Sequence, residues 1–131
     1  MATRSGSVDP GALLYLLRER LLTEGELADA LEHDSGLAGL SGGGSGDVRE
    51  ASQLALDVFV HRIAAAVAAM AAACGGIDVL AFTGGIGEHA ADVRERIAER
   101  VHFLGDFRVE VVPSREELVI ATETRRFLGS G

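Results

Sequence analysis

The stretch that decides the fold is Ile77-Asp78-Val79-Leu80-Ala81-Phe82-Thr83-Gly84-Gly85-Ile86-Gly87-Glu88. Its first seven residues form an apolar run, interrupted near its start by Asp78, which predicts a buried strand. The glycines that follow predict a tight turn leading into a helix. A strand, a glycine turn and a helix together begin a parallel α/β unit, in which a helix connects two parallel strands.

The residues after this stretch complete the unit. Apolar residues at helical spacing predict a helix that continues to about Leu104, with Gly105 as its stop. A second strand is predicted over residues 108–112. The last helix is predicted over residues 114–127, and its first residue, a serine, pairs with Glu117 in a capping box. The second half of the chain is therefore expected to be β-loop-α-β-α.

The first part of the chain is predicted to be helical. Leucines at helical spacing follow Asp9-Pro10 and continue to about Leu31. Pro10 supports a helix start here, because a proline suits the first turn of a helix. Thr23 and Glu26 form a capping box at the start of a second short helix. Residues 35–46 are rich in glycine and are expected to be a connector.

A long helix is predicted next, over residues 48–73, with Gly75-Gly76 after its end. We expect His61 and Arg62 on a solvated or partner-facing side of this helix, with a ligand role as the less favoured alternative, and Cys74 packed in the core. Because its second half is nearly all alanine, another helix or a second subunit can pack closely against it. Its apolar stripe consists of Leu56, Phe59, Val60, Ile63, Val67 and Met70.

Composition excludes several classes of protein. The chain has 131 residues, 47% of them hydrophobic, which suits one folded domain and not a disordered acidic tail. It carries 12 Lys and Arg against 20 Asp and Glu, and the net charge of −8 disfavours nucleic acid as a partner. The apolar run Ile63 to Cys74 is short for a bilayer and no secretory signal is visible, so we expect a cytoplasmic protein with no membrane partner.

The glycine turn is the sharpest chemical feature of the sequence. Phosphate oxygens bind where several backbone N–H groups converge, and a glycine turn at a helix N-terminus provides such groups. The turn is not a P-loop, because no Gly-Lys-Ser/Thr follows it, and Ala90 stands where a dinucleotide fingerprint has its third glycine. Two interpretations remain: a phosphate-binding loop, or a turn that needs glycines for its geometry alone.

Three other segments carry side chains suited to the same chemistry. Arg4 offers a guanidinium that can bind phosphate or carboxylate oxygens as a fork. Asp47-Val48-Arg49 places an acid and a base at a predicted helix start, and Glu116 offers a carboxylate for a hard cation such as Mg²⁺. Each also has a structural interpretation: an arginine in solvent, a helix-start acid, and a surface acid favoured by the helix dipole.

Taken together and in order, these segments resemble the acetate kinase family, and the resemblance corresponds to the last part of a longer enzyme. It implies an α/β fold: a partial ribonuclease-H-like lobe of the acetate and sugar kinase–actin superfamily, helix-rich first and then β-α-β-α. Residues 1–47 would be a helical insertion and connector, and residues 48–131 the long helix with the β-α-β-α unit. The segments are Met1 to Gly6, Ser35-Gly36-Leu37, Gly46-Asp47-Val48-Arg49-Glu50, Phe82 to Glu88, and Pro113 to Leu118.

The resemblance implies reversible phosphorylation of acetate by ATP with Mg²⁺, which gives acetyl phosphate. Arg4 matches the arginine that clamps the transferring phosphoryl group, and Glu116 matches the magnesium ligand. The implied partners are a small carboxylate, a nucleotide and a second copy of the chain, because members of this family are homodimers. The implied nucleotide-binding residues are Asp47, Val48, Arg49, Gly85, Ile86, Gly87, Glu88 and His89.

The chain also departs from the family pattern. Ser7 stands where an acid is usual and His89 where Asn is usual, and a stretch between Glu50 and Leu54 is missing. The family's first lobe has no counterpart and Met1 matches an internal methionine, so we expect a truncated reading frame with little activity alone. The alternative is a residual nucleotide-binding or dimerisation module without catalysis. The missing third glycine disfavours a dinucleotide-dependent enzyme.

Overall fold

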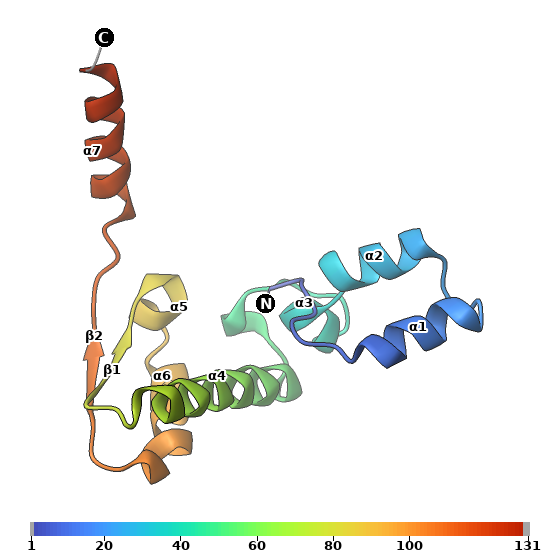
Figure 1. Ribbon diagram of the computed structural model, residues 1–131, viewed down its shortest axis with the longest axis horizontal. Helices are drawn as coiled ribbons and strands as arrows, with labels where there is room; N and C mark the ends of the chain where they lie inside the picture. The colour runs from blue at the N-terminus through green and yellow to red at the C-terminus, as the bar shows by residue number, and fades with distance from the viewer. Residues whose placement is uncertain (1, 130–131) are drawn as a thin grey trace. The chain divides into compact units, whose positions relative to one another are not determined.

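A computed structural model of the chain describes residues 2–129. The chain divides into two compact units, residues 1–67 and residues 68–131, and α4 begins in the first and ends in the second. The first unit is built from helices: α1 (Pro10–Arg18), α2 (Glu24–Glu32), α3 (Gly36–Leu40), η1 (Val48–Glu50) and most of α4 (Gln53–Cys74) (Figure 1). The second holds the end of α4 and then β1 (Val79–Phe82), α5 (Gly84–His89), α6 (Ala91–Val101), η2 (His102–Leu104), β2 (Arg108–Val111) and α7 (Glu116–Leu128).

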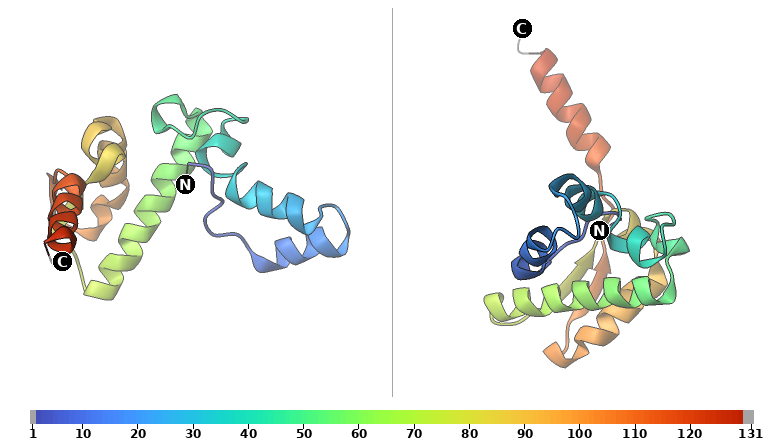
Figure 2. Two further views of the ribbon diagram at one scale, coloured as in Figure 1. Left: turned by 90° about the horizontal axis from the view of Figure 1, so that it is seen from above. Right: turned by 90° about the vertical axis from the view of Figure 1, so that its right-hand side faces the viewer.

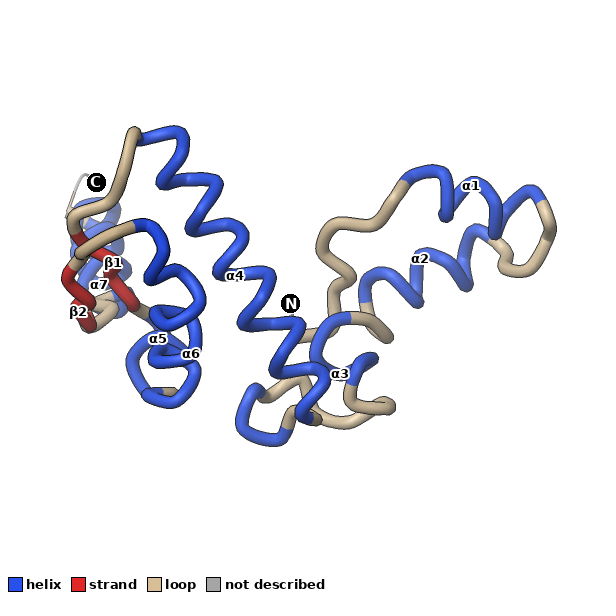
Figure 3. Tube along the Cα trace, turned by 90° about the horizontal axis from the view of Figure 1, so that it is seen from below, coloured by secondary structure: helices blue, strands red, loops and turns tan. Residues whose placement is uncertain are grey.

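Side-chain caps set the starts of the first two helices. The Asp9 carboxylate accepts a hydrogen bond of 3.0 Å from the backbone N–H of Ala12 at the start of α1. At α2, Thr23 Oγ1 accepts from the N–H of Glu26, whose carboxylate accepts in return from the N–H of Thr23 at 2.8 Å. This confirms the capping box predicted from the sequence. The two helices lie side by side (Figures 2 and 3).

The glycine-rich region 35–46 is more structured than the sequence suggests. It contains the short helix α3, and Leu37 and Ala38 on this helix are buried. The prediction of a simple connector was therefore wrong, because two apolar side chains among the glycines are enough to anchor one helical turn. The positive φ angles of Gly42 and Gly43, 81° and 88°, then turn the chain away from α3.

The first residues form an extended segment, here called the N-terminal strap (residues 2–6), that is tied to α2 and α3. It has no secondary structure of its own, so its backbone groups pair with these neighbours. Four hydrogen bonds hold it: Ser5 N–H to Leu31 C=O at 2.9 Å, Ser35 N–H to Thr3 C=O at 2.8 Å, Ala38 N–H to Ala2 C=O at 3.0 Å, and Thr3 O–H to Glu32 C=O at 3.0 Å. The strap is thereby fixed on both sides of Arg4.

The long helix begins later than predicted. Residues 48–50 form the single turn η1, and α4 starts at Gln53 after two extended residues. The predicted stripe is buried at Phe59 and Val60, but Met70 is 63% exposed. Alanines take its place in the core, since the buried residues of α4 also include Ala55, Ala64 and Ala71. The helix ends as predicted, because Gly75 and Gly76 adopt positive φ angles.

Two expectations about α4 need correction. Cys74 is exposed and not packed in the core. The helix is also long and apolar enough, by length and composition, to cross a membrane, with a mean hydropathy of 1.7 over 18 residues. The expectation considered only the apolar run Ile63 to Cys74, whereas the helix also includes the ten residues before that run, from Gln53 onward. The core helix of a soluble protein passes the same test, so the helix alone does not show a membrane span.

The second unit contains a parallel sheet of two strands, as predicted. Val79 of β1 lies opposite Arg108 of β2, and Phe82 lies opposite Val111 (Figure 1). The prediction that the first strand is buried was wrong: its residues alternate between exposed and half-buried, and β2 is exposed throughout. A strand is buried only when other elements cover it, and the described residues provide no third strand.

The helices that follow the strands also differ from the prediction. Ala90 divides the first of them into α5 and α6, and three residues of α6 are buried: Val93, Ile97 and Val101. The predicted capping box of the last helix is absent, because α7 starts at Glu116 and its N-cap Arg115 makes no side-chain hydrogen bond. The whole of α7 is exposed, and it projects beyond the end of β2 (Figures 1 and 2).

The strap generates the first testable prediction. A Cβ atom on Gly46 would lie 2.7 Å from Ala2 Cβ and 3.1 Å from Ala2 Cα, so Gly46→Ala must push the strap away. We expect Gly46→Ala to lower the free energy of unfolding by about 1–3 kcal/mol, the usual cost of overpacking, measured by urea denaturation. Gly44→Ala is the control: its Cβ would meet nothing within 4 Å, so no loss is expected. Equal stabilities of the two variants would contradict the packing described here.

Candidate functional site

Arg4 lies on the N-terminal strap and lines a cavity of about 480 Å³ in the first unit. The strap, the turn before α3 and the first turns of α4 form the walls of this cavity. Within residues 2–129, the guanidinium of Arg4 has neither a hydrogen-bond partner nor an ion pair. The cavity therefore presents a cation that is free to meet an anion. Other lining residues include Ser5, Ser7, Ser35, Leu37 and Val58.

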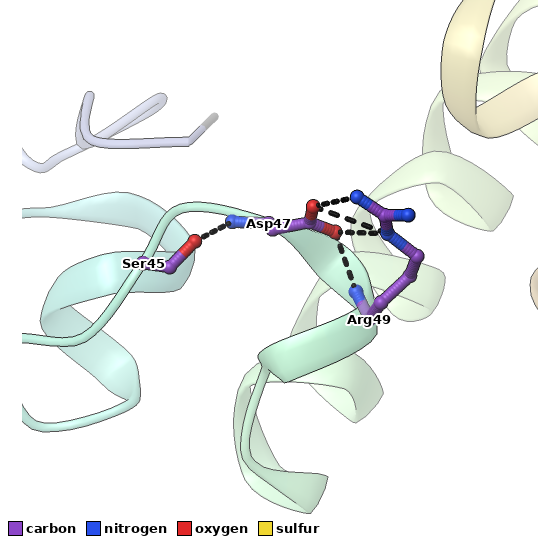
Figure 4. Close-up of polar contacts among 3 residues, drawn as sticks. All are labelled: Ser45, Asp47 and Arg49. Carbon is purple, nitrogen blue, oxygen red and sulfur yellow. Dashed lines mark hydrogen bonds and ion pairs between the residues drawn. The ribbon is translucent and has the colours of Figure 1, made fainter.

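Asp47 and Arg49 form a closed pair at the start of η1 (Figure 4). Asp47 Oδ1 accepts hydrogen bonds from the backbone N–H of Arg49 at 2.9 Å and from its Nε at 3.0 Å. Arg49 Nη2 donates to Asp47 Oδ2, and Ser45 Oγ accepts from the Asp47 N–H at 3.0 Å. The buried neighbour between them, Val48, anchors the turn in the core.

This pairing determines the protonation of Asp47. The side-chain hydrogen bonds from Arg49, and next its backbone N–H, lower the pKa of Asp47 to about 2. The carboxylate is therefore charged throughout the physiological range and neutralises the nearby guanidinium. The Arg49 side chain remains 83% exposed, so a ligand can reach it while Asp47 holds it.

The glycine turn forms the short helix α5. Its glycines are under different structural constraints. Gly84 has a φ of 74°, which side chains rarely adopt, and a Cβ on Gly87 would lie 3.3 Å from the carbonyl carbon of Phe82. Gly85 has neither constraint, since a Cβ there would meet nothing within 4 Å. The backbone at Gly85 is thus open to a ligand.

Glu88 ties this turn to the segment after β2. Its Oε1 atom accepts from the backbone N–H of Ser114 at 2.8 Å and from that of Gly84 at 3.0 Å. These bonds, that from Ser114 first, lower the pKa of Glu88. A carboxylate thus occupies two N–H groups that a phosphate would otherwise meet. Ser114 does not cap α7, because the helix starts at Glu116 and Arg115 takes the N-cap position.

Glu116 lies in the exposed first turn of α7, two residues after Ser114. Within residues 2–129 no group of three or more His, Cys, Asp or Glu side chains is placed to hold a metal ion. Mg²⁺ is commonly bound through one or two carboxylates with substrate phosphates and water. The donor set available here, a single carboxylate, fits that pattern and not a site built from protein side chains alone.

The structure brings the predicted residues together in two groups. In the first unit, Gly46 packs directly on Ala2, so the strap that carries Arg4 is joined to the segment that carries Asp47. In the second unit, the bond from Ser114 to Glu88 joins the glycine turn to the segment that leads to Glu116. The sequence indicated the residues but not these two contacts, because each joins positions far apart in the chain.

The Asp47–Arg49 pair generates a prediction about pH. Since the pKa of Asp47 is lower in the folded protein than in the unfolded chain, the pair stabilises the fold above about pH 4, and this contribution declines toward about pH 2. We expect the carboxyl carbon of Asp47 to titrate near pH 2 by NMR, and at a higher pH in Arg49→Ala, which loses the guanidinium but keeps the backbone N–H bond to Asp47. Titration near 3.9 in the unmodified protein would show that the pair does not form in solution.

Comparisons of the sequence with known proteins point to one family. A sequence model described as the acetokinase family matches residues 1–127. The acetate kinase of Protochlamydia amoebophila is 46% identical over 112 residues, covering 80% of this chain and 28% of that protein. That of Rickettsia prowazekii is 37% identical over 155 residues, covering 98% of this chain and 40% of that protein. Because 155 exceeds the 131 residues of this chain by 24, at least that many residues of the relative have no counterpart here.

Solved structures give the same result and establish the fold class, that of the acetate and sugar kinase–actin superfamily. The crystal structure of Porphyromonas gingivalis acetate kinase matches with a TM-score of 0.83 at 34% identity, covering 98% of this chain and 40% of that one. A propionate kinase from Francisella tularensis matches with a TM-score of 0.84 at 33% identity, covering 94% of this chain and 39% of that one. The chain spans well under half the length of the relatives it matches. On this evidence the chain belongs to the acetokinase family.

Proposed function

We propose that this chain is the C-terminal part of an ATP-dependent phosphotransferase that acts on a short carboxylate such as acetate, and that these 131 residues alone have little or no activity. The observation that carries the proposal is the match to the acetokinase family over residues 1–127. The chain would supply one side of the reaction site: a cation for the transferring phosphoryl group, contacts to the nucleotide and a ligand for magnesium.

Arg4 is the residue we assign to the phosphoryl group. In phosphoryl transfer, negative charge on the equatorial oxygens must be stabilised by groups already in position. The hydrogen bonds of the N-terminal strap hold the backbone of Arg4, and its guanidinium lines a cavity without a counterion among the described residues. A fixed backbone and an unpaired cation are what this role requires.

The nucleotide contacts are assigned to two segments. Asp47, Val48 and Arg49 form one, in which Asp47 holds the guanidinium of Arg49 in a fixed direction. Residues 85–89 form the other, where the open backbone at Gly85 allows close approach and Glu88 fixes the turn. His89 ends this short helix and is exposed.

Glu116 is the residue we assign to Mg²⁺. The ion would neutralise charge on the nucleotide phosphates during transfer. The carboxylate of Glu116 lies in the first turn of α7 and is exposed, so it can take its place in a coordination shell completed by phosphate oxygens and water. Its position two residues after Ser114 keeps it beside the turn that Glu88 fixes.

The first test is catalysis by the chain alone. Transfer in line between two substrates requires groups on both sides of a site that excludes water, and the chain covers 28% to 41% of the length of its relatives. We therefore expect the purified chain, given acetate and MgATP, to form no acetyl phosphate above background when the product is trapped with hydroxylamine. Turnover that disappears in Arg4→Ala would overturn this expectation.

The second test concerns nucleotide binding, the function that remains if catalysis is absent. A Cβ atom on Gly85 would meet nothing within 4 Å, so we expect Gly85→Leu to keep the fold but to cover the backbone that a nucleotide would approach. By calorimetry we expect weak MgATP binding that is lost in Gly85→Leu. Gly25→Leu, on α2 and equally unobstructed, is the control and should bind as the unmodified chain does. Equal binding by both variants would place the nucleotide elsewhere.

A further inference from the structure

Arg62 projects from α4 toward the N-terminal strap. A Cβ atom built on Gly6 would lie 4.0 Å from Arg62 Nη2, so the head of this side chain reaches the last residue of the strap, two positions from Arg4. Both arginines line the cavity of about 480 Å³. The sequence favoured a solvated or partner-facing side for Arg62 over a ligand role, but the fold sets its guanidinium beside Gly6, 56 positions earlier in the chain.

The cavity extends beyond Arg62. A second hollow of about 430 Å³ lies along α4, and Ser7 and Arg62 line both cavities. Arg62 therefore lies where the two hollows adjoin, and a small ligand in either of them can reach this residue. Its side chain is exposed, so a ligand would not have to open the fold to reach it.

The charges in the cavity are not balanced by the protein. Two arginines outside the cavity pair with an acid: Arg49 with Asp47, and Arg108 with Glu110. In the part of the chain that the structure describes, the guanidinium groups of Arg4 and Arg62 have neither a hydrogen bond nor an ion pair. Asp34 is the acidic residue among those that line the larger cavity. Two guanidinium groups against one carboxylate leave the site with a local positive charge.

Hydroxyl groups complete a site for an oxyanion. Ser5, Ser7 and Ser35 line the larger cavity. Ser35 already donates its hydroxyl hydrogen to Ala30 C=O at 2.6 Å, whereas Ser7 has no such bond among the described residues, so Ser7 can donate to a ligand. Guanidinium forks and a hydroxyl donor are the groups that bind phosphate oxygens.

We propose that Arg62 and Arg4 bind one phosphate-type dianion together in this cavity, so that Arg62 is a second binding residue for the transferring phosphoryl group. Two guanidinium groups match two negative charges, which favours a phosphoryl group over a singly charged carboxylate. The identification of the anion with the transferring group rests on the proposed function. The anion site itself rests on the cavity and its unpaired arginines.

The test follows the Arg Nε–H signals by NMR as inorganic phosphate is added at constant ionic strength. We expect the signals of Arg4 and Arg62 to shift with one common dissociation constant, and the signal of Arg18, exposed on α1 outside the cavity, to stay in place. An equal titration with acetate should give much weaker binding. Shifts of Arg4 and Arg62 with different constants, or equal shifts at Arg18, would overturn the proposal, as would tighter binding of acetate.

Substitutions of single residues test whether Arg62 contributes to phosphate binding. Arg62→Gln removes one charged partner and should weaken phosphate binding, read at Arg4, by roughly tenfold to a hundredfold. Arg18→Gln is the matched control and should change nothing. Asp34→Asn removes the negative charge from the cavity and should tighten binding severalfold. Because Arg62 is exposed, its replacement should leave the circular dichroism spectrum unchanged. Unaltered phosphate binding in Arg62→Gln would refute the shared site.

The outcomes separate this proposal from the proposed function. Phosphate binding that depends on Arg62, without MgATP binding at Gly85, would support the anion site and contradict the assignment of the nucleotide. MgATP binding that is lost in Gly85→Leu, without a phosphate response at Arg4 and Arg62, would support the assignment of the nucleotide and contradict the anion site.

Discussion

The N-terminal strap is the constraint on which the first unit depends. Residues 2–6 have no secondary structure, and their position is set by hydrogen bonds to the end of α2 and to α3. Those bonds place the backbone of Arg4 at the edge of a cavity, press Ala2 against Gly46, and leave Gly6 facing Arg62. A segment of five residues therefore joins three elements that are remote in sequence, and the cavity exists only while the strap stays bound.

A single carboxylate has a comparable role in the second unit. Glu88 joins the glycine turn at the end of β1 to the segment after β2, through the N–H groups of Gly84 and Ser114. The two strands end side by side, so a link at this edge fixes the loops that follow both. A residue assigned to nucleotide binding can thus act mainly by positioning: it holds the backbone at Gly85 open and does not itself need to contact a ligand.

The sequence predicted those features that depend on near neighbours. The Thr23–Glu26 capping box is local, and it formed as expected. The equivalent prediction for Ser114 failed because α7 starts at Glu116, which makes Arg115 the N-cap, and the Ser114 N–H bonds to Glu88, 26 residues away, instead of Glu117. Strand positions and their parallel pairing were predictable, but the burial of β1 was not, since burial depends on what covers a sheet. For the site, motifs indicated Arg4, whereas no pattern around Arg62 shows that α4 aims it at the strap.

Net charge and local charge lead to different conclusions about partners. The chain has a net charge of −8, which opposes extended polyanions such as nucleic acids. A small anion responds to the few groups within contact distance, because more distant charges are screened by salt. The lining of the larger cavity carries Arg4 and Arg62 against Asp34, so the charge of this lining is positive although the molecule is acidic. An acidic chain can therefore bind a compact dianion and still repel an extended polyanion such as a nucleic acid.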